Sequence, residues 1–364
     1  MAISKQLHIE AIQTAIPSNV TQSGKSRRIN LTDTTLTQDS LQSRFRMVFY
    51  YNKSSEEESA WTVAAWVKES MSVALADWPE LAGRLRKDRE GDGCWEIKIN
   101  DAGVRLVQAS VEMQLDEFLA AEDRAEKEAA LANWSEIDGE NPDFSALFYI
   151  QVTQFEGNGY AVGITFSLLL NDPLFLIQFL KSWTQTHMGM LADGSLSKNP
   201  MFHLGYFQRP SRPKHLKSIA LDSFPCADAT TTILFKAPEI QSDNRDSYRK
   251  LASTCIEEAV KSTRGNGMSK FSLIVNKSDG LEIESCDIGA HVKAESNEDV
   301  SGAVKPVKWQ ELGMEDFTLT KGNKPVYVSY RFISLVDEPL IVMMQSDDQE
   351  KDGAEMFIGA AIPN

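Results

Sequence analysis

The sequence has little cysteine, no long apolar run and fewer basic than acidic residues. Its cysteines, Cys94, Cys226, Cys255 and Cys286, are far apart in a chain of 364 residues and form no Cys-x-x-Cys motif, which excludes a disulfide scaffold. No stretch of about 18 apolar residues occurs, and the N-terminus lacks the apolar core of a signal peptide. We therefore expect reduced thiols, no transmembrane segment and a cytoplasmic protein.

The charge balance argues against polyanionic partners. Lys and Arg number 37 against 52 Asp and Glu, which gives a formal net charge of −15. A chain of this charge is repelled by nucleic acid, so no nucleic-acid partner is expected. The composition, 42% hydrophobic and 24% charged, is otherwise that of a globular protein. At about 100 to 200 residues per domain, the length predicts two domains.

The widespread catalytic signatures are also missing. The sequence contains no P-loop, no Gly-x-Gly-x-x-Gly motif, no His-Glu-x-x-His motif and no Gly-x-Ser-x-Gly elbow. Its histidines, His8, His187, His203, His215 and His291, show no metal-ligand spacing, so no metal site is predicted. We interpret His187 as a core residue, because it lies near the end of an apolar helical segment.

Two helices are predicted in the first third of the chain. Residues 55–87 have apolar residues at three- and four-residue intervals, with Ser55 and Glu58 spaced as a capping box and Trp78-Pro79 as the end. Residues 115–133 form an acidic amphipathic pattern, whose charges are expected to face solvent. Between them, residues 94–107 have the character of one strand.

A hairpin followed by a buried helix is predicted near the middle. Residues 147–155 and 160–170 are rich in β-forming residues and are joined by Glu-Gly-Asn-Gly, which favours an antiparallel turn. The next residues, Asp172 and Pro173, suit the N-cap and the first position of a helix. The segment after them is apolar nearly all round, as in a buried helix.

The domain boundary is predicted in a segment rich in proline and basic residues. Residues 205–229 contain three prolines, four Lys or Arg and no apolar periodicity. We therefore divide the chain into 1–204, a connection at 205–229, and 230–364. The last part is expected to contain one helix at 248–261 and strands at 230–236, 271–275, 326–333, 340–345 and 356–362.

Two neighbouring segments resemble a known enzyme family. Residues 75–86, LADWPELAGRLR, and 95–111, WEIKINDAGVRLVQASV, resemble the BAHD acyltransferases, plant enzymes that transfer an acyl group from coenzyme A to an alcohol or amine. The likeness is strong over residues 1–190 and thinner from about residue 230. It implies an α/β, two-domain, chloramphenicol-acetyltransferase-like fold with mixed sheets, a channel between the halves, and a second domain that is reduced.

One position departs from the family's catalytic motif. The family has His-x-x-x-Asp after the hairpin, with the histidine as general base; here Leu168 occupies the histidine position and Asp172 is retained. A leucine cannot accept a proton, and general base catalysis contributes roughly 10²- to 10⁴-fold to a rate. Leu168 equally continues the apolar face of the hairpin. If a replacement base exists nearby, the candidates are Ser167 and Asn171.

The remaining family features are interpreted as structural. The resemblance implies a structural role for Asp172, and a degenerate second signature includes Asp316, Phe317 and Gly322. It also implies a coenzyme A thioester as substrate, with no tightly bound cofactor. If coenzyme A binds, the sequence predicts that Leu168→His would create acyl transfer.

The resemblance leaves three functions open. Similarity to the histidine-less eceriferum branch implies a non-catalytic modifier of very-long-chain fatty-acid elongation, which acts with an elongase condensing enzyme at the cytosolic face of the endoplasmic reticulum. The alternative is an atypical enzyme that performs acyl transfer, cyclisation or lyase chemistry on a plant metabolite. A third is a binding or decoy protein for acyl-CoA or another small molecule. A monomer is expected in each case.

Overall fold

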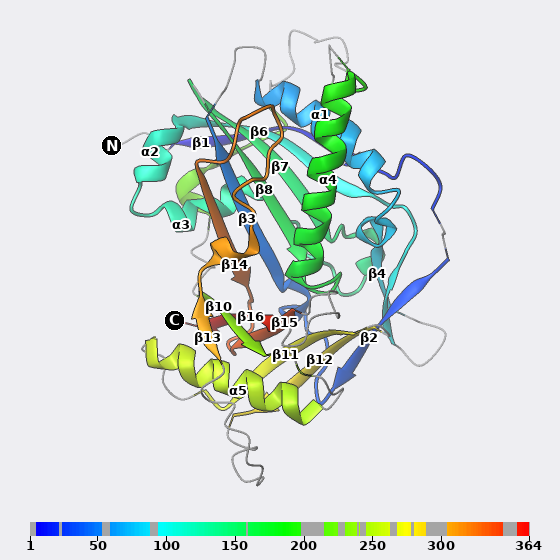
Figure 1. Cartoon of the computed structure of the whole chain (residues 1–364), viewed down its shortest axis with the longest axis vertical. Helices are drawn as coiled ribbons and strands as arrows, with labels where there is room; N and C mark the ends of the chain where they lie inside the picture. Colours follow the sequence, from blue (N-terminus) through cyan, green and yellow to red (C-terminus); the bar gives the residue numbers. More distant parts are fainter. Residues whose placement is uncertain are drawn as a thin grey trace.

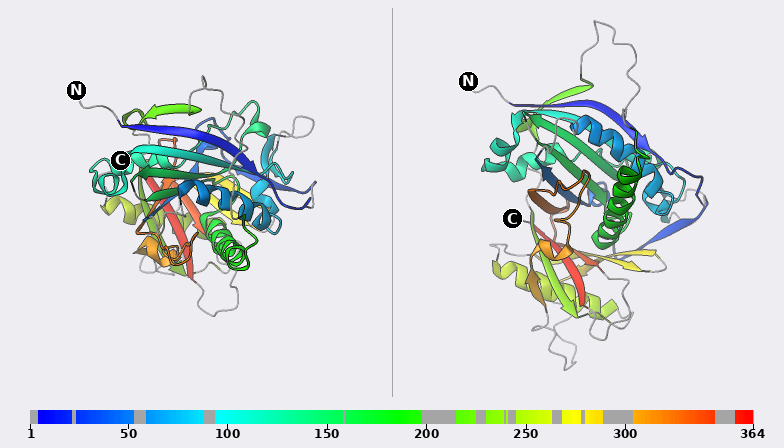
Figure 2. Two further views of the ribbon diagram at one scale, coloured as in Figure 1. Left: turned by 90° about the horizontal axis from the view of Figure 1, so that it is seen from above. Right: turned by 45° about the horizontal axis from the view of Figure 1, so that its top comes forward.

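Two mixed β-sheets form the framework of the computed structural model (Figure 1). The residues that the structure describes are 5–21, 24–52, 59–87, 94–157, 159–197, 215–224, 230–238, 240, 245–262, 268–277, 280–288, 304–344 and 355–363. In the right-hand view of Figure 2, one sheet lies above the other, with helices packed on both.

The first sheet has seven strands. Across the sheet, their order is β14 (Tyr327–Ile333), β3 (Arg44–Tyr51), β8 (Tyr160–Ser167), β7 (Phe148–Glu156), β6 (Val104–Gln114), β1 (Gln6–Ala15) and β9 (Lys217–Ala220). Only β6 and β7 pair in parallel among these strands. The predicted hairpin is confirmed as β7 and β8, although β8 ends at Ser167 and not at Leu170.

The second sheet has nine strands. Their order is β13 (Lys305–Val307), β10 (Thr230–Pro238), β16 (Glu355–Pro363), β15 (Leu340–Met344), β11 (Lys270–Lys277), β12 (Gly280–Asp287), β2 (Ser26–Thr32), β5 (Trp95–Lys98) and β4 (Arg84–Lys87). β11 pairs in parallel with β15, and β12 with β2. The strands expected in the last third are confirmed, whereas β12 and β13 were not predicted.

Both sheets take strands from both halves of the chain. β2, β4 and β5 precede residue 100 and extend the second sheet, while β14 follows residue 300 and forms an edge of the first. The domain boundary at 205–229 stays a prediction. Each sheet contains strands from both sides of that boundary. This exchange brings the Arg27 side chain of β2 within hydrogen-bonding reach of Asn276 of β11, although β12 lies between the two strands.

The helices cover three sheet faces. α1 (Ala60–Ala74) and α4 (Pro173–Asp193) pack on one face of the first sheet, as Figure 1 shows. The opposite face is covered by α2 (Leu115–Ala120), α3 (Arg124–Lys127) and η3 (Glu128–Leu131). α5 (Arg245–Ser262) packs on the second sheet. The other 3-10 turns are η1 (Ser40–Gln42), η2 (Pro79–Ala82), η4 (Pro142–Phe144), η5 (Leu221–Ser223) and η7 (Trp309–Leu312).

Three local predictions were wrong. The single strand expected at 94–107 is two strands, because residues 99–103 form a turn in which Asp101 and Gly103 have positive φ. The helix expected at 115–133 is broken into α2, α3 and η3, and Glu128, expected in solvent, is only 3% exposed. Tertiary contact explains the break, since the Tyr50 hydroxyl donates to the Glu128 carboxylate at 3.0 Å.

The first predicted helix begins later than its pattern suggests. α1 starts at Ala60, and the Ser59 side chain accepts a hydrogen bond from the Thr62 N–H at 3.2 Å, as an N-cap does. The predicted capping box, Ser55 and Glu58, lies outside the described residues.

Candidate functional site

Asp172 is the N-cap of α4. Its Oδ1 accepts hydrogen bonds from the backbone N–H groups of Leu174 (2.8 Å) and Phe175 (3.1 Å), and Pro173 occupies the first helical position. The sequence signal for this helix start is confirmed. Burial raises the pKa of the Asp172 carboxyl, while hydrogen bonds from Asn276, Phe175 and Leu174 act in the opposite direction.

Leu168 is part of the main hydrophobic core. Its side chain has 0% exposure and belongs to the same apolar cluster as Phe166 and Trp183. Its backbone N–H donates to the Ser43 carbonyl at 3.1 Å, which ties the end of the hairpin to the start of β3. An aliphatic side chain in this environment contributes packing and has no group that can accept a proton.

The two candidate replacement bases are engaged in local structure. Ser167 is fully buried, and its Oγ accepts the Leu169 N–H at 3.3 Å. Asn171 Oδ1 accepts the Asp172 N–H at 2.8 Å and also a hydrogen bond from Asn276. Ser167 directly follows Phe166 in β8, so the two side chains lie on opposite sheet faces, and Ser167 pairs with Arg44 of β3. The structure therefore does not bring Ser167 together with Asp172.

A polar network joins the start of α4 to the second sheet. Asn276 of β11 donates to Asp172 Oδ2 at 3.0 Å, and Arg27 of β2 donates to the Asn276 side-chain oxygen. Arg27 also donates to the Leu170 carbonyl at 2.8 Å. Burial lowers the pKa of Arg27, and the negative charges of Glu80 and Asp172 counteract this. The network fixes the relative position of the two sheets at the candidate site, and no sequence motif pointed to Asn276.

Removing the Asp172 carboxylate tests how much this network contributes to stability. We expect Asp172→Ala to lower the free energy of unfolding by about 2 kcal/mol, because a helix cap is lost and the half-buried Asn276 amide loses an acceptor. Asp172→Asn, which keeps an N-cap acceptor, should lose less than half of that. Urea denaturation measures both, and equal losses would show that capping is not the main role of the side chain.

The degenerate second signature lies against the first sheet. Phe317 is 2% exposed, and its ring centroid lies 4.5 Å from that of Phe49 and 5.6 Å from that of Trp183. The Tyr51 hydroxyl donates to the Phe317 carbonyl at 2.7 Å. Asp316 forms an exposed ion pair with Lys324. Gly322 has a φ of 76°, a value that favours glycine.

His187 connects α4 to the same segment. Its Nε2 donates to the Leu319 carbonyl at 2.8 Å, so its Nδ1 accepts the hydrogen bond from the Ser70 hydroxyl at 2.8 Å. The Trp183 indole N–H donates to the same hydroxyl at 2.9 Å. Burial lowers the pKa of His187 to about 4, so the ring is neutral at physiological pH. The interpretation of His187 as a core residue agrees with its 0% exposure.

The two segments that carry the family resemblance contact each other. Arg84 Nη1 donates to the Gly83 and Gly103 carbonyls at 2.9 and 2.8 Å, and its Nη2 donates to the Ala102 carbonyl at 3.0 Å. Burial lowers the pKa of Arg84 to about 10. At Gly103, φ is 82° and a Cβ would collide with the Ala15 backbone. These residues therefore hold the turn between β5 and β6.

Within the described part of the chain, no group of three or more His, Cys, Asp or Glu side chains is arranged to hold a metal ion. No helix among these residues is long and apolar enough to cross a membrane. The described cysteines are Cys94, which is exposed, and Cys255 and Cys286, which are buried and free. Cys226, His203 and His291 lie outside the described residues.

Comparison with known proteins identifies the family. A family model described as the Transferase family matches residues 7–253, which is more than half of the chain. The eceriferum 26-like protein of Arabidopsis thaliana is 32% identical over 123 residues, covering 34% of this chain and 28% of that protein. A hydroxycinnamoyltransferase of Narcissus pseudonarcissus is 28% identical over 213 residues, covering 54% and 47%. Each match thus spans less than half of the relative's length.

A solved structure supports the same assignment of fold. The crystal structure of vinorine synthase aligns with 98% of this chain and 95% of its own, with a TM-score of 0.50 and 16% sequence identity. At this identity the likeness concerns the fold alone. It confirms the predicted two-domain α/β architecture with mixed sheets.

Proposed function

Because this chain belongs to the Transferase (BAHD) family, we propose that it is an acyltransferase-like protein without acyl transfer activity, which modifies very-long-chain fatty-acid elongation. In this role it binds a fatty-acid elongase condensing enzyme at the cytosolic face of the endoplasmic reticulum. The single observation that carries the proposal is the burial of Leu168 in the hydrophobic core, and by the motif's register we assign this residue to the position of the family's catalytic histidine.

The surroundings of Leu168 support a structural use of the motif. Asp172 accepts hydrogen bonds from two backbone N–H groups and from the Asn276 side chain, as expected of a helix cap that also links the two halves of the chain. Ser167 lies on the other face of β8, and Asn171 accepts from Asp172 and Asn276. A nucleophile or general base needs a partner that activates or orients it. The contacts of these side chains are those of a folded core.

The residue at position 168 favours elongation over the enzymatic alternative, whereas sequence identity does not separate the two. The eceriferum 26-like protein and an agmatine hydroxycinnamoyltransferase of Oryza sativa are each 32% identical to this chain over 34% of its length. The elongation role needs no general base, which is consistent with leucine at 168. We infer that this protein contacts coenzyme A thioesters only while their acyl chains are being elongated on the partner enzyme.

Reconstitution in yeast tests the proposal. The chain is co-expressed with a plant elongase condensing enzyme, and acyl chain lengths are measured by gas chromatography. We expect longer acyl chains than with the condensing enzyme alone. Ser167→Ala removes the hydroxyl, and Asp172→Asn removes the carboxylate while keeping a helix-cap acceptor. Because the proposed role is not catalytic, both variants should retain the shift to longer chains at equal expression. A shift abolished by either variant in a folded, well-expressed protein would indicate catalysis.

The variant Leu168→His distinguishes the proposed function from an enzymatic role. Under the proposed function, we expect this variant to release coenzyme A from acyl-CoA at background rate with a broad panel of alcohols and amines, because the side chain at 168 lies in the core. Thiol detection of free coenzyme A measures the rate, and circular dichroism establishes that the variant is folded. A rate at least about 100-fold above background would reveal an intact substrate site and would favour the atypical enzyme.

A further inference from the structure

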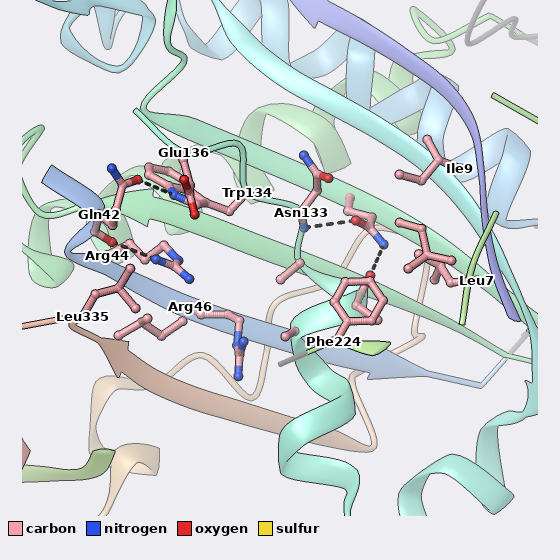
Figure 3. Close-up of a pocket in the computed structure, with 16 residues that line it drawn as sticks. Leu7, Ile9, Gln42, Arg44, Arg46, Asn133, Trp134, Glu136, Phe224 and Leu335 are labelled. Carbon is pink, nitrogen blue, oxygen red and sulfur yellow. Dashed lines mark hydrogen bonds between the residues drawn. The ribbon is translucent and has the colours of Figure 1, made fainter. Parts of the chain in front are cut away.

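A cavity of about 230 Å³ lies on the face of the first sheet that is turned away from α1 and α4. It is bordered by β1, β3, β7 and the segment around residues 129–136 (Figure 3). Leu168, Asn171 and Asp172 do not line it. The cavity is thus separate from the family's catalytic position, and the proposed function assigns it no role.

One side of the cavity carries positive charge. Arg44 and Arg46 are two residues apart on β3, so both point to this face, and Figure 3 shows their guanidinium groups on the same side of the cavity. Arg46 is only 3% exposed. Among the lining residues that the structure describes, Glu136 is the one acidic side chain beside these two cations. A cationic cavity is unexpected in a chain with a net charge of −15.

The position of Arg44 is fixed by neighbouring groups. Its Nη1 donates to the Gln42 carbonyl at 2.8 Å, and its guanidinium carbon lies 5.4 Å from the centroid of a Trp134 ring. The Trp134 indole N–H donates to Gln42 Oε1 at 3.1 Å, which fixes the ring as well. A guanidinium presents a fork of N–H donors that matches a carboxylate in geometry and charge. Holding it in place reduces the entropy cost of binding an anion.

The other side of the cavity is apolar. Leu7 and Ile9 of β1 are 1% and 6% exposed, and Ile219 of β9 and Phe224 complete this wall. Figure 3 shows Leu7 and Ile9 across the cavity from the two arginines. A cavity of about 150 Å³ is known to hold benzene, so by proportion this one holds a ligand of about nine or ten non-hydrogen atoms, head group included.

From these observations we propose that the cavity binds a small monocarboxylic acid, with its carboxylate at Arg44 and Arg46 and its apolar body against Leu7, Ile9, Ile219 and Phe224. The charge selects an anion, the apolar wall selects against inorganic ions, and the volume limits the length of the body. The site does not depend on the proposed role in elongation, because it lies on the opposite face of the sheet from Leu168.

Calorimetric titration of the full-length protein with octanoate tests the proposal. We expect a dissociation constant between about 10 μM and 1 mM, which is ordinary for a ligand of this size. Octan-1-ol and octylamine, which have the same chain with a neutral or a positive head group, should bind at least tenfold more weakly. No detectable octanoate binding up to about 1 mM, or equal affinity for all three compounds, would overturn the proposal.

Substitutions locate the binding site. Arg44→Gln should weaken octanoate binding at least tenfold, whereas Arg86→Gln, the same charge change at an exposed residue of β4, should leave it within about twofold. In protein labelled with ¹⁵N at its seven tryptophans, octanoate should shift the indole signal that is missing in Trp134→Phe. If that signal stays unchanged while octanoate binds, the acid binds elsewhere and the proposed site is wrong.

Discussion

Gly163→Ala is expected to destabilise the protein by about 3 kcal/mol or more, even though only one methyl group is added. Gly163 lies in the middle of β8, and a Cβ there would overlap the Leu131 carbonyl oxygen and approach its carbonyl carbon at 2.7 Å. Both atoms belong to backbone, which cannot move aside as a flexible side chain can. The glycine therefore allows the segment after α3 to lie directly on the sheet.

Gly189→Ala provides the matched control for this prediction. Gly189 lies inside α4, and a Cβ added there would meet no atom within 4 Å. Since alanine is a better helix former than glycine, this variant should be stabilised by about 0.5 to 1 kcal/mol. Thermal and urea unfolding of the two variants measure the contrast. A loss of less than about 1 kcal/mol for Gly163→Ala would mean that the segment can withdraw from β8.

His187 is expected to make folding strongly dependent on pH. Its pKa is lowered from 6.5 to about 4 in the folded protein because the ring is buried. The unfolded chain then binds the proton more tightly, so the stabilisation is complete above about pH 6.5 and is lost as the pH falls toward about 4. Between about pH 7.5 and about pH 4.5, this group alone should cost about 2 to 3 kcal/mol of stability.

His187→Gln isolates this contribution, because other groups, including Asp172, titrate in both proteins. Glutamine keeps an amide that can donate to the Leu319 carbonyl but does not titrate. Urea unfolding at the two pH values should show the wild-type protein losing about 2 to 3 kcal/mol more than the variant. Parallel losses in the two proteins would mean that His187 is protonated without unfolding the chain.

Much of the fold was predictable because its signals are local. The Asp172-Pro173 pair specifies the start of α4, and two alternating runs around a glycine-rich turn specify the β7–β8 hairpin. The density of the match over residues 75–111 led to the family, which the family model confirms, and the likeness to vinorine synthase confirms the fold. The interpretation of Leu168, Ser167, Asn171 and Asp172 stays a prediction, as does the division of the chain at 205–229.

The sequence by itself determined the family and, through that resemblance, the α/β class of fold with mixed sheets, because the match depends on residue types and on neighbours a few positions apart. Only the tertiary structure decided that β2 pairs with β12, that Asn276 and Arg27 reach Asp172, and that Glu128 is buried in a broken helix. The cavity beside Arg44 was likewise decided by the tertiary structure alone. These features join residues far apart in the chain, and pairing over such separations is selected by the packing of the whole core, for which a single sequence carries no local signal.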